Sequence, residues 1–173
     1  KMAATLSSTG TTTIFMNAAE AIHGDLGIID DGDIVIIISN SGSSDEIINI
    51  IEPIKRIGAK VVAFTGNEKS KLGVSADLII NIGVEKEACP MGIAPMSSTT
   101  ATLVMSDALA VVLMKLRDFK PENFALYHPG GSLGKRLLLK VKDLMHAGDE
   151  MPIVTKDEHI EDILMILSNK NKR

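Results

Sequence analysis

The sequence has no tryptophan, one tyrosine and only 3% aromatic residues among its 173 positions. A core must therefore be built from isoleucine, valine, leucine, methionine and alanine, a mixture that suits helices packed on a parallel sheet. The chain also has a single cysteine, Cys89, which excludes an intrachain disulfide and fits a reducing compartment. We therefore expect a cytoplasmic protein.

Strong charge and long hydrophobic runs are also missing. The formal net charge is −4 and no basic stripe is present, so we expect no nucleic-acid partner. No signal peptide is recognisable. The longest apolar stretch, residues 101–114, is interrupted by Ser106 and Asp107 and is shorter than the roughly 20 residues of a membrane span. We expect a soluble protein that does not contact a membrane.

Short runs of β-branched residues predict strands, and helical patterns separate the three longest runs. The longest continuous one, Ile34–Ile38, is apolar throughout, as in a central strand that is covered on both faces. Strand–helix–strand repeats at this spacing predict right-handed βαβ units and a parallel sheet. The predicted strands are Thr13–Met16, Ile34–Ser39, Val61–Thr65 and Leu78–Ile82.

Two longer helices are predicted. Residues 45–57 carry isoleucines at helical spacing before Gly58, although Pro53 predicts a kink or an early break. A second, nearly all-apolar helix follows the irregular stretch 83–96 and runs to about Arg117. Its hydroxyl residues 97–100 are candidates for the N-cap. Such a helix is expected to be central or to lie in a subunit interface.

The loop Ser39-Asn40-Ser41-Gly42-Ser43-Ser44 is the strongest functional signal, because it stands between a buried strand and a helix. Serine hydroxyls and free backbone N–H groups at a helix N-terminus bind phosphate. The carboxyl end of a parallel strand is also where α/β sheets bind ligands. The loop lacks dinucleotide and P-loop glycine spacing, so it suits a monophosphate. The alternative is an ordinary polar turn with Ser44 as the N-cap.

The candidate acid–base groups each have a structural alternative. Glu46 is expected in the first helical turn, where it either relays a proton or only complements the helix dipole. Glu87 is either a functional carboxylate of the irregular loop or a surface residue. His128 and His23 are either proton-transfer groups or solvated side chains. No His or Cys pair has metal-ligand spacing, and Cys89 is interpreted as a buried thiol.

The serine loop, followed by Glu46, resembles the phosphate loop of sugar isomerase (SIS) domains. Four further segments, in the same order, resemble the arabinose-5-phosphate isomerase family: residues 19–27, 86–95, 97–103 and 128–134. This resemblance covers essentially the whole chain. It implies a three-layer α-β-α fold with a mostly parallel sheet, at residues 1–140, without its N-terminal part. Residues 141–173 resemble the beginning of a CBS domain, which is incomplete here.

The resemblance also implies a function. Members of this family interconvert D-ribulose 5-phosphate and D-arabinose 5-phosphate for Kdo and lipopolysaccharide synthesis, without a cofactor or metal, as homotetramers that share active sites between subunits. It implies Glu46, Glu87 and His128 as catalytic groups, with a further lysine upstream of this chain. The implied substrate-binding residues are Ser39, Asn40, Ser41, Ser44, His23, Ser97 and Thr99.

A carboxylate base works best with a raised pKa, so one of Glu46 and Glu87 is expected to be partly desolvated. Either of the two is a candidate for the base, and His128 for the acid on the oxygen side. Two other functions remain open: a sensor that binds a sugar phosphate without turnover, and an isomerase of another phosphosugar.

Overall fold

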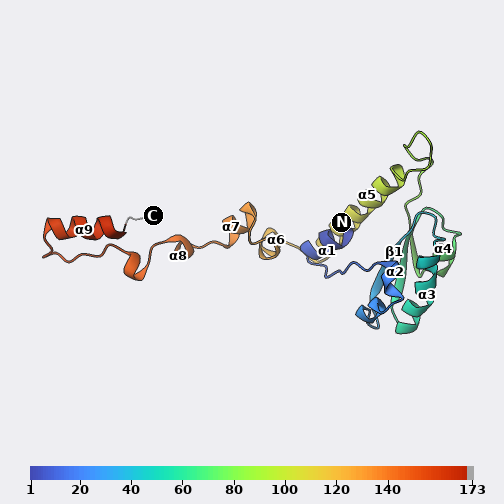
Figure 1. Ribbon diagram of the computed structural model, residues 1–173, viewed down its shortest axis with the longest axis horizontal. Coiled ribbons are helices and arrows are strands. Elements are labelled where there is room, and N and C mark those ends of the chain that lie inside the picture. Colours follow the sequence, from blue (N-terminus) through green and yellow to red (C-terminus); the bar gives the residue numbers. More distant parts are fainter. Residues whose placement is uncertain (171–173) are drawn as a thin grey trace. The chain divides into compact units, whose positions relative to one another are not determined.

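The computed structural model describes residues 1–170. In it, three of the predicted strands form a parallel sheet, flanked by helices (Figure 1). The strands are β1 (Ile34–Ile38), β2 (Lys60–Thr65) and β3 (Leu78–Asn81), in the order β1-β2-β3. Ile34 pairs with Lys60, and Val62 with Leu78. The predicted α/β class with a parallel sheet is confirmed.

The central strand is β2, not β1. Val61, Ala63 and Phe64 of β2 are fully buried, whereas Ile34 at the start of β1 is 68% exposed. An apolar run favours burial, but the position of a strand in the sheet depends on which edges are paired. Among the described residues, β1 pairs only with β2. The prediction that Ile34–Ile38 is covered on both faces is therefore wrong.

The predicted strand Thr13–Met16 does not form. Ile14 is 65% exposed and Phe15 is 79% exposed, and the Thr13 carbonyl accepts a hydrogen bond from the Ser7 hydroxyl instead of from a strand. β-branched residues give a preference for extended backbone, but a strand also needs a neighbour that pairs with it. The described residues contain no strand paired with this segment.

The core lies between the sheet and two helices, α3 (Asp45–Ile57) and α4 (Lys71–Ser75). Ile50, Ile51 and Ile54 are buried against β2 and α4. The helical spacing of these isoleucines therefore predicted the buried face correctly. α3 runs through Pro53 and ends at Gly58 in the left-handed region, so the C-cap is confirmed and an early break is not. Two shorter elements, α2 (Ala18–Ala21) and the 3₁₀ turn Asp25–Ile28, precede the sheet.

Asp77 ties β3 to β2. Its Oδ2 accepts the backbone N–H of Val61 at 2.8 Å, and the Lys60 ammonium is 3.9 Å from Oδ1. The hydrogen bond from Val61, helped by the nearby lysines, lowers the pKa of Asp77 below its usual value. A carboxylate with a lowered pKa stabilises the folded state above its unfolded pKa, about 3.9, and loses that contribution as the pH falls.

Asp77→Asn is therefore expected to destabilise the fold more at pH 7 than at about pH 2, which lies below the unfolded pKa, where the contribution of the ionised carboxylate declines. Urea unfolding of the variant and the unchanged protein at both pH values measures the difference. Glu52→Gln, which removes an exposed carboxylate of α3, is the control. An equal effect of Asp77→Asn at both pH values would show that its charge contributes nothing.

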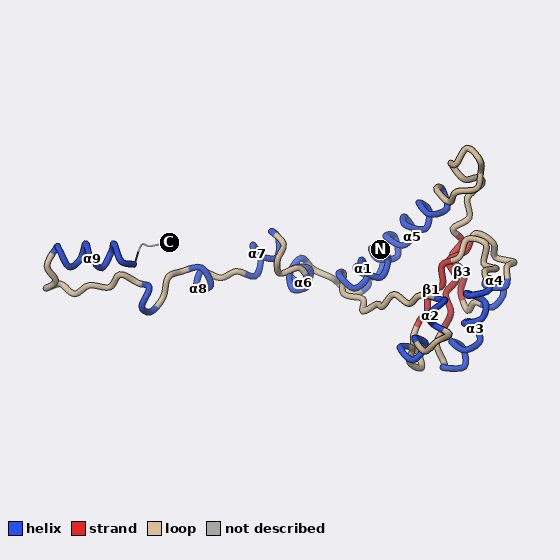
Figure 2. The backbone as a smooth tube through the Cα atoms, viewed as in Figure 1, coloured by secondary structure: helices blue, strands red, loops and turns tan. Residues whose placement is uncertain are grey.

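α5 (Ser97–Leu116) has the predicted length and packs against α1 (Met2–Ser8), with Lys1 paired to Asp107. Figure 2 shows the long loop that leads from β3 to α5. By length and composition alone, this is the one described helix that qualifies for a membrane span. The same test is passed by core helices of soluble proteins, so it does not separate the two cases.

The contacts divide the chain into a first unit, Lys1–Phe119, and a second unit that begins at Lys120. The second unit consists of short helices, of which α6 (Pro121–Tyr127) packs against α7 (Ser132–Leu138). The predicted boundary near residue 140 and the CBS segment 141–173 stay predictions, and residues 171–173 lie outside the described residues. After α6 and α7, the second unit continues with α8 (Val141–Leu144), the 3₁₀ turn Gly148–Glu150 and α9 (Ile160–Lys170).

Candidate active site

The loops after the three strands meet at the carboxyl edge of the sheet. The Gly66 N–H donates to the Asn40 carbonyl at 3.0 Å, and the Thr65 hydroxyl donates to the same oxygen at 3.2 Å. A Cβ atom on Gly66 would lie 3.3 Å from the Cα of Gly83 and against the Asn40 side chain. The segments that follow β1, β2 and β3 are therefore in contact, which is the edge where parallel sheets bind ligands.

The serine loop has a fixed backbone. The Ser39 hydroxyl accepts the N–H of Gly42 at 3.1 Å, and the Gly42 carbonyl accepts the N–H of Leu72 at 3.0 Å. Gly42 has φ 64°, in the left-handed region that favours glycine. A Cβ atom there would also lie 2.7 Å from the Cβ of the buried Ser70. Glycine at position 42 therefore allows the loop to lie directly on α4.

Gly42→Ala is expected to destabilise the protein by about 2 kcal/mol or more, since a left-handed alanine costs about 1–2 kcal/mol before any clash. Gly32→Ala is the matched control, because Gly32 also has a positive φ but nothing lies within 4 Å of its added Cβ. The urea midpoints of both variants separate the clash from the backbone strain. Equal destabilisation would contradict the proposed close packing of the loop on α4.

The N-terminus of α3 is open toward the serine loop. Ser44 occupies the N-cap position, but its side chain makes no capping hydrogen bond. By contrast, Ser70 caps α4 through the N–H of Gly73 at 3.1 Å, and Asn17 caps α2 through the N–H of Ala19 at 2.9 Å. The interpretation of Ser44 as an ordinary cap is therefore not supported. The Ile47 N–H donates to the Ser44 carbonyl at 3.1 Å, so the N–H groups of Asp45 and Glu46 and the partial positive charge of α3 are what an anion can use.

Glu87, not a hydroxyl residue of positions 97–100, caps α5. Its Oε2 accepts the backbone N–H groups of Met96 at 2.7 Å, Ser97 at 2.7 Å and Ser98 at 3.3 Å. The N-cap residue Met96 has no capping side chain of its own. The sequence prediction placed the cap among residues adjacent in sequence, whereas the loop folds back and brings in a carboxylate from nine residues upstream.

These contacts favour the ionised form of Glu87. The Ser98 side chain, and then the backbone N–H of Met96, hold the pKa of Glu87 below its usual value. This direction is opposite to that expected of a base with a raised pKa. Glu46 lies in the first turn of α3, beside the open N-terminus, and its side chain is exposed. Desolvation of Glu46 is therefore not a property of the free site.

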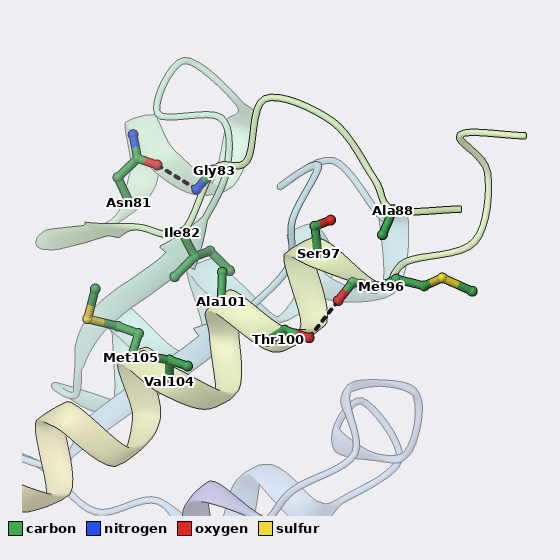
Figure 3. Close-up of a pocket in the computed structure, with 10 residues that line it drawn as sticks. All are labelled: Asn81, Ile82, Gly83, Ala88, Met96, Ser97, Thr100, Ala101, Val104 and Met105. Atoms are coloured by element: carbon green, nitrogen blue, oxygen red, sulfur yellow. Dashed lines mark hydrogen bonds between the residues drawn. The ribbon is translucent and has the colours of Figure 1, made fainter. Parts of the chain in front are cut away.

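A cavity of about 660 Å³ lies between the end of β3 and the N-terminal half of α5 (Figure 3). Its lining includes the apolar Ile82, Ala101 and Val104, and the polar Asn81 and Ser97. The serine loop does not line it. This cavity is mostly apolar, so it suits a phosphate less well than the exposed loop at the N-terminus of α3 does.

His128 belongs to the second unit of the chain. Its Nδ1 lies 3.0 Å from the Phe124 carbonyl, and its ring stacks on the Phe124 ring with centroids 3.9 Å apart. A carbonyl only accepts, so Nδ1 carries the proton and Nε2 is left for proton transfer. In this neutral tautomer Nε2 accepts a proton and does not donate one, and the acid role expected of His128 stays a prediction. His23 is exposed beyond the end of α2, and no hydrogen bond among the described residues links it to the serine loop.

The remaining predicted substrate-binding residues, Asn40, Ser41, Ser97 and Thr99, differ in their exposure and in their hydrogen bonds. Asn40 uses its carbonyl on Gly66, and its side chain is exposed, as is Ser41. Ser97 lines the cavity. The Thr99 hydroxyl donates to the carbonyls of Pro95 and Met96, at 3.2 and 2.9 Å, so its proton is engaged by its own helix. Within residues 1–170, no hydrogen bond brings Ser97 or Thr99 to the serine loop.

Two residues at this edge were missed. Thr65 ends β2, and its hydroxyl bonds the Asn40 carbonyl. Asn81 ends β3, donates to Glu68 Oε1 at 2.7 Å and accepts the N–H of Gly83 at 2.7 Å. The available signal was a polar residue at the last position of a predicted parallel strand, as for Thr65, or next to it, as for Asn81. Among the described residues, no three His, Cys, Asp or Glu side chains cluster to hold a metal ion.

The parallel sheet, the glycine-fixed serine loop and the open helix N-terminus define an α/β domain with a candidate anion site at the carboxyl edge of its sheet. The sequence pattern of the SIS domain family matches residues 1–112. The chain belongs to the SIS domain family, as its sequence predicted.

Curated relatives agree with this assignment. The chain is 53% identical over 171 residues to the arabinose 5-phosphate isomerases KdsD of Salmonella typhi and Escherichia coli K12, covering 99% of this chain and 52% of each relative. It is 48% identical to KdsD of Pseudomonas aeruginosa over 170 residues, covering 98% and 52%. The chain thus spans about half the length of these relatives.

A solved structure from E. coli CFT073, in complex with arabinose 5-phosphate, superimposes with a TM-score of 0.72 and 44% identity, covering 74% of this chain and 68% of that chain. A structure from Bacteroides fragilis superimposes with the same TM-score and 37% identity, covering 75% and 69%. The resemblance stated from the sequence is therefore confirmed at the level of both sequence and fold.

Proposed function

We propose that this chain carries the phosphate-binding loop and acid–base groups of an aldose–ketose isomerase that interconverts D-ribulose 5-phosphate and D-arabinose 5-phosphate. The observation that carries the proposal is the open N-terminus of α3, which follows the serine loop directly and has Glu46 in its first turn. The names of the KdsD relatives, and the arabinose 5-phosphate complex of the E. coli relative, support this choice of substrate.

The chemistry requires a ring-opened sugar and a proton transfer between C1 and C2 through a cis-enediol. A base removes the carbon-bound proton, and an acid protonates or polarises the oxygens. In our proposal the loop holds the phosphate, a carboxylate from Glu46 or Glu87 acts as the base, and Nε2 of His128 serves the oxygens. The phosphate contacts come from Ser39, Ser41, Ser44 and the first-turn N–H groups.

Further contacts follow from the family. Asn40, His23, Ser97 and Thr99 contact the sugar in this proposal, and a lysine of the family's upstream motif completes the catalytic set. The reaction needs no redox cofactor or metal. We also propose a cytoplasmic homotetramer with active sites shared between subunits, a CBS segment from residue 141, and a role in Kdo and lipopolysaccharide synthesis.

The substrate is tested by assaying the protein that carries this chain against a panel of pentose and hexose phosphates. We expect interconversion of the two pentose 5-phosphates to exceed that of any hexose phosphate. Turnover of a different phosphosugar would leave the isomerase class standing but change the substrate. Binding without turnover of any sugar phosphate would favour a sensor.

A further inference from the structure

We infer that Glu87 is a positioning residue, which fastens the loop 83–96 to the first turn of α5, and that it is not the base that removes the carbon-bound proton. This inference rests on the proposed function and assigns the base to Glu46. It follows from which atoms the Glu87 carboxylate contacts, and from what the loop would lose without them.

The carboxylate of Glu87 is already engaged. One oxygen, Oε2, accepts three backbone N–H groups, two of them at 2.7 Å. A base must accept the proton that it abstracts. Protonation of either oxygen of Glu87 would remove the charge that strengthens the three hydrogen bonds to Oε2, so these bonds favour the ionised form. Those contacts suit a fixed anion better than a proton acceptor.

The Glu87 contacts join the two ends of this loop, and Cys89 lies near its middle, where the backbone N–H groups of Ala94 and Ile93 lower the pKa of its thiol. Between Glu87 and Met96 the chain closes a ring in which only Cys89 is buried, while Met91 is 75% exposed and Ile93 is 78% exposed. Within the ring, one described backbone hydrogen bond runs from the Gly92 N–H to the Cys89 carbonyl. The ends of the ring are joined by the Glu87 contacts, so these contacts position Ser97 and the cavity wall.

The Glu87 contacts also make the N-terminus of α5 differ from that of α3. The N-terminus of α5 holds the carboxylate of Glu87, which already accepts the backbone N–H groups of that end. The N-terminus of α3 has no cap from Ser44, and its first turn carries the carboxylates of Asp45 and Glu46. The free backbone N–H groups of α3 are therefore the ones left for a sugar phosphate, with Glu46 in the same turn. An active site arranged in this way uses Glu87 for geometry and Glu46 for chemistry.

Comparison of Glu87→Gln with Glu87→Ala tests the inference in the protein that carries this chain. The glutamine amide oxygen still accepts the three N–H groups, whereas alanine accepts none. We expect kcat to fall less than about tenfold for Glu87→Gln and more than about a hundredfold for Glu87→Ala. The acidic limb of the kcat–pH profile is expected to persist in Glu87→Gln, because its base is unchanged.

A readout without turnover keeps the test independent of the proposed function. Amide hydrogen exchange at positions 96–98 is expected to accelerate in Glu87→Ala but to stay within about threefold in Glu87→Gln. Glu85→Gln, at an exposed site of the same loop, is the control for both measurements. Loss of turnover and of the acidic limb in Glu87→Gln, with exchange preserved, would make Glu87 the base and overturn the inference.

If the unchanged protein turns over no sugar phosphate, the proposed function fails. The exchange measurement then still decides whether Glu87 holds the loop, and equal protection in Glu87→Ala and in the unchanged protein would overturn the positioning role.

Discussion

Glu46→Gln is expected to lower kcat by at least about a hundredfold, with less than about a threefold change in KM. The glutamine would keep the size and the helical position of Glu46 but could not accept the carbon-bound proton. Since the phosphate contacts are made by the serine loop and backbone N–H groups, substrate binding is expected to persist. Steady-state kinetics on D-arabinose 5-phosphate measures both constants.

The matched control is Glu52→Gln, the same chemical change on the same helix. Glu52 is exposed and pairs with Arg56 at 3.2 Å, one helical turn along α3. It is expected to leave kcat within about twofold, since exposed pairs contribute little. Turnover of Glu46→Gln at the level of this control would exclude Glu46 as the base. The assignment would then return to Glu87.

Ser41→Ala combined with Ser44→Ala is expected to raise KM by about a hundredfold or more, with a smaller effect on kcat. Each hydroxyl that donates to a charged phosphate contributes about 1.5–3 kcal/mol, or roughly 10- to 100-fold in affinity. The backbone N–H groups of the loop and of α3 remain, so binding is weakened and not abolished. Inhibition by inorganic phosphate is expected to weaken in parallel.

Ser75→Ala, at the end of α4, is the control for loss of a serine hydroxyl outside the loop. An unchanged KM in the double variant would show that Ser41 and Ser44 do not contact the phosphate. The loop would then be an ordinary turn, the alternative that the sequence left open.

Local patterns predicted the elements of this fold well. The isoleucine spacing of residues 45–57 and the glycine at 58 indicated the buried face and the end of α3, because both follow from contacts within one helix. The apolar run at Ile34–Ile38 also predicted a strand. Its place at one side of the sheet was not predictable from that run, since strand order depends on pairing between distant segments.

The candidate site shows the same division. The serine loop was predictable because strand, loop and helix are consecutive in the sequence. The cap that Glu87 supplies to α5 was not, because it joins residues nine positions apart through an irregular loop. A hydroxyl run at 97–100 satisfied the local rule for an N-cap, but a carboxylate that accepts three N–H groups satisfies the same helix end better.

The central claim is that a carboxylate next to the serine loop exchanges a carbon-bound proton of a bound sugar phosphate. Incubating the protein that carries this chain with D-arabinose 5-phosphate in D₂O tests it directly. The account predicts formation of D-ribulose 5-phosphate and incorporation of solvent deuterium at C1 or C2, detected by NMR and mass spectrometry. Saturable binding of D-arabinose 5-phosphate with neither isomerisation nor deuterium incorporation would contradict it.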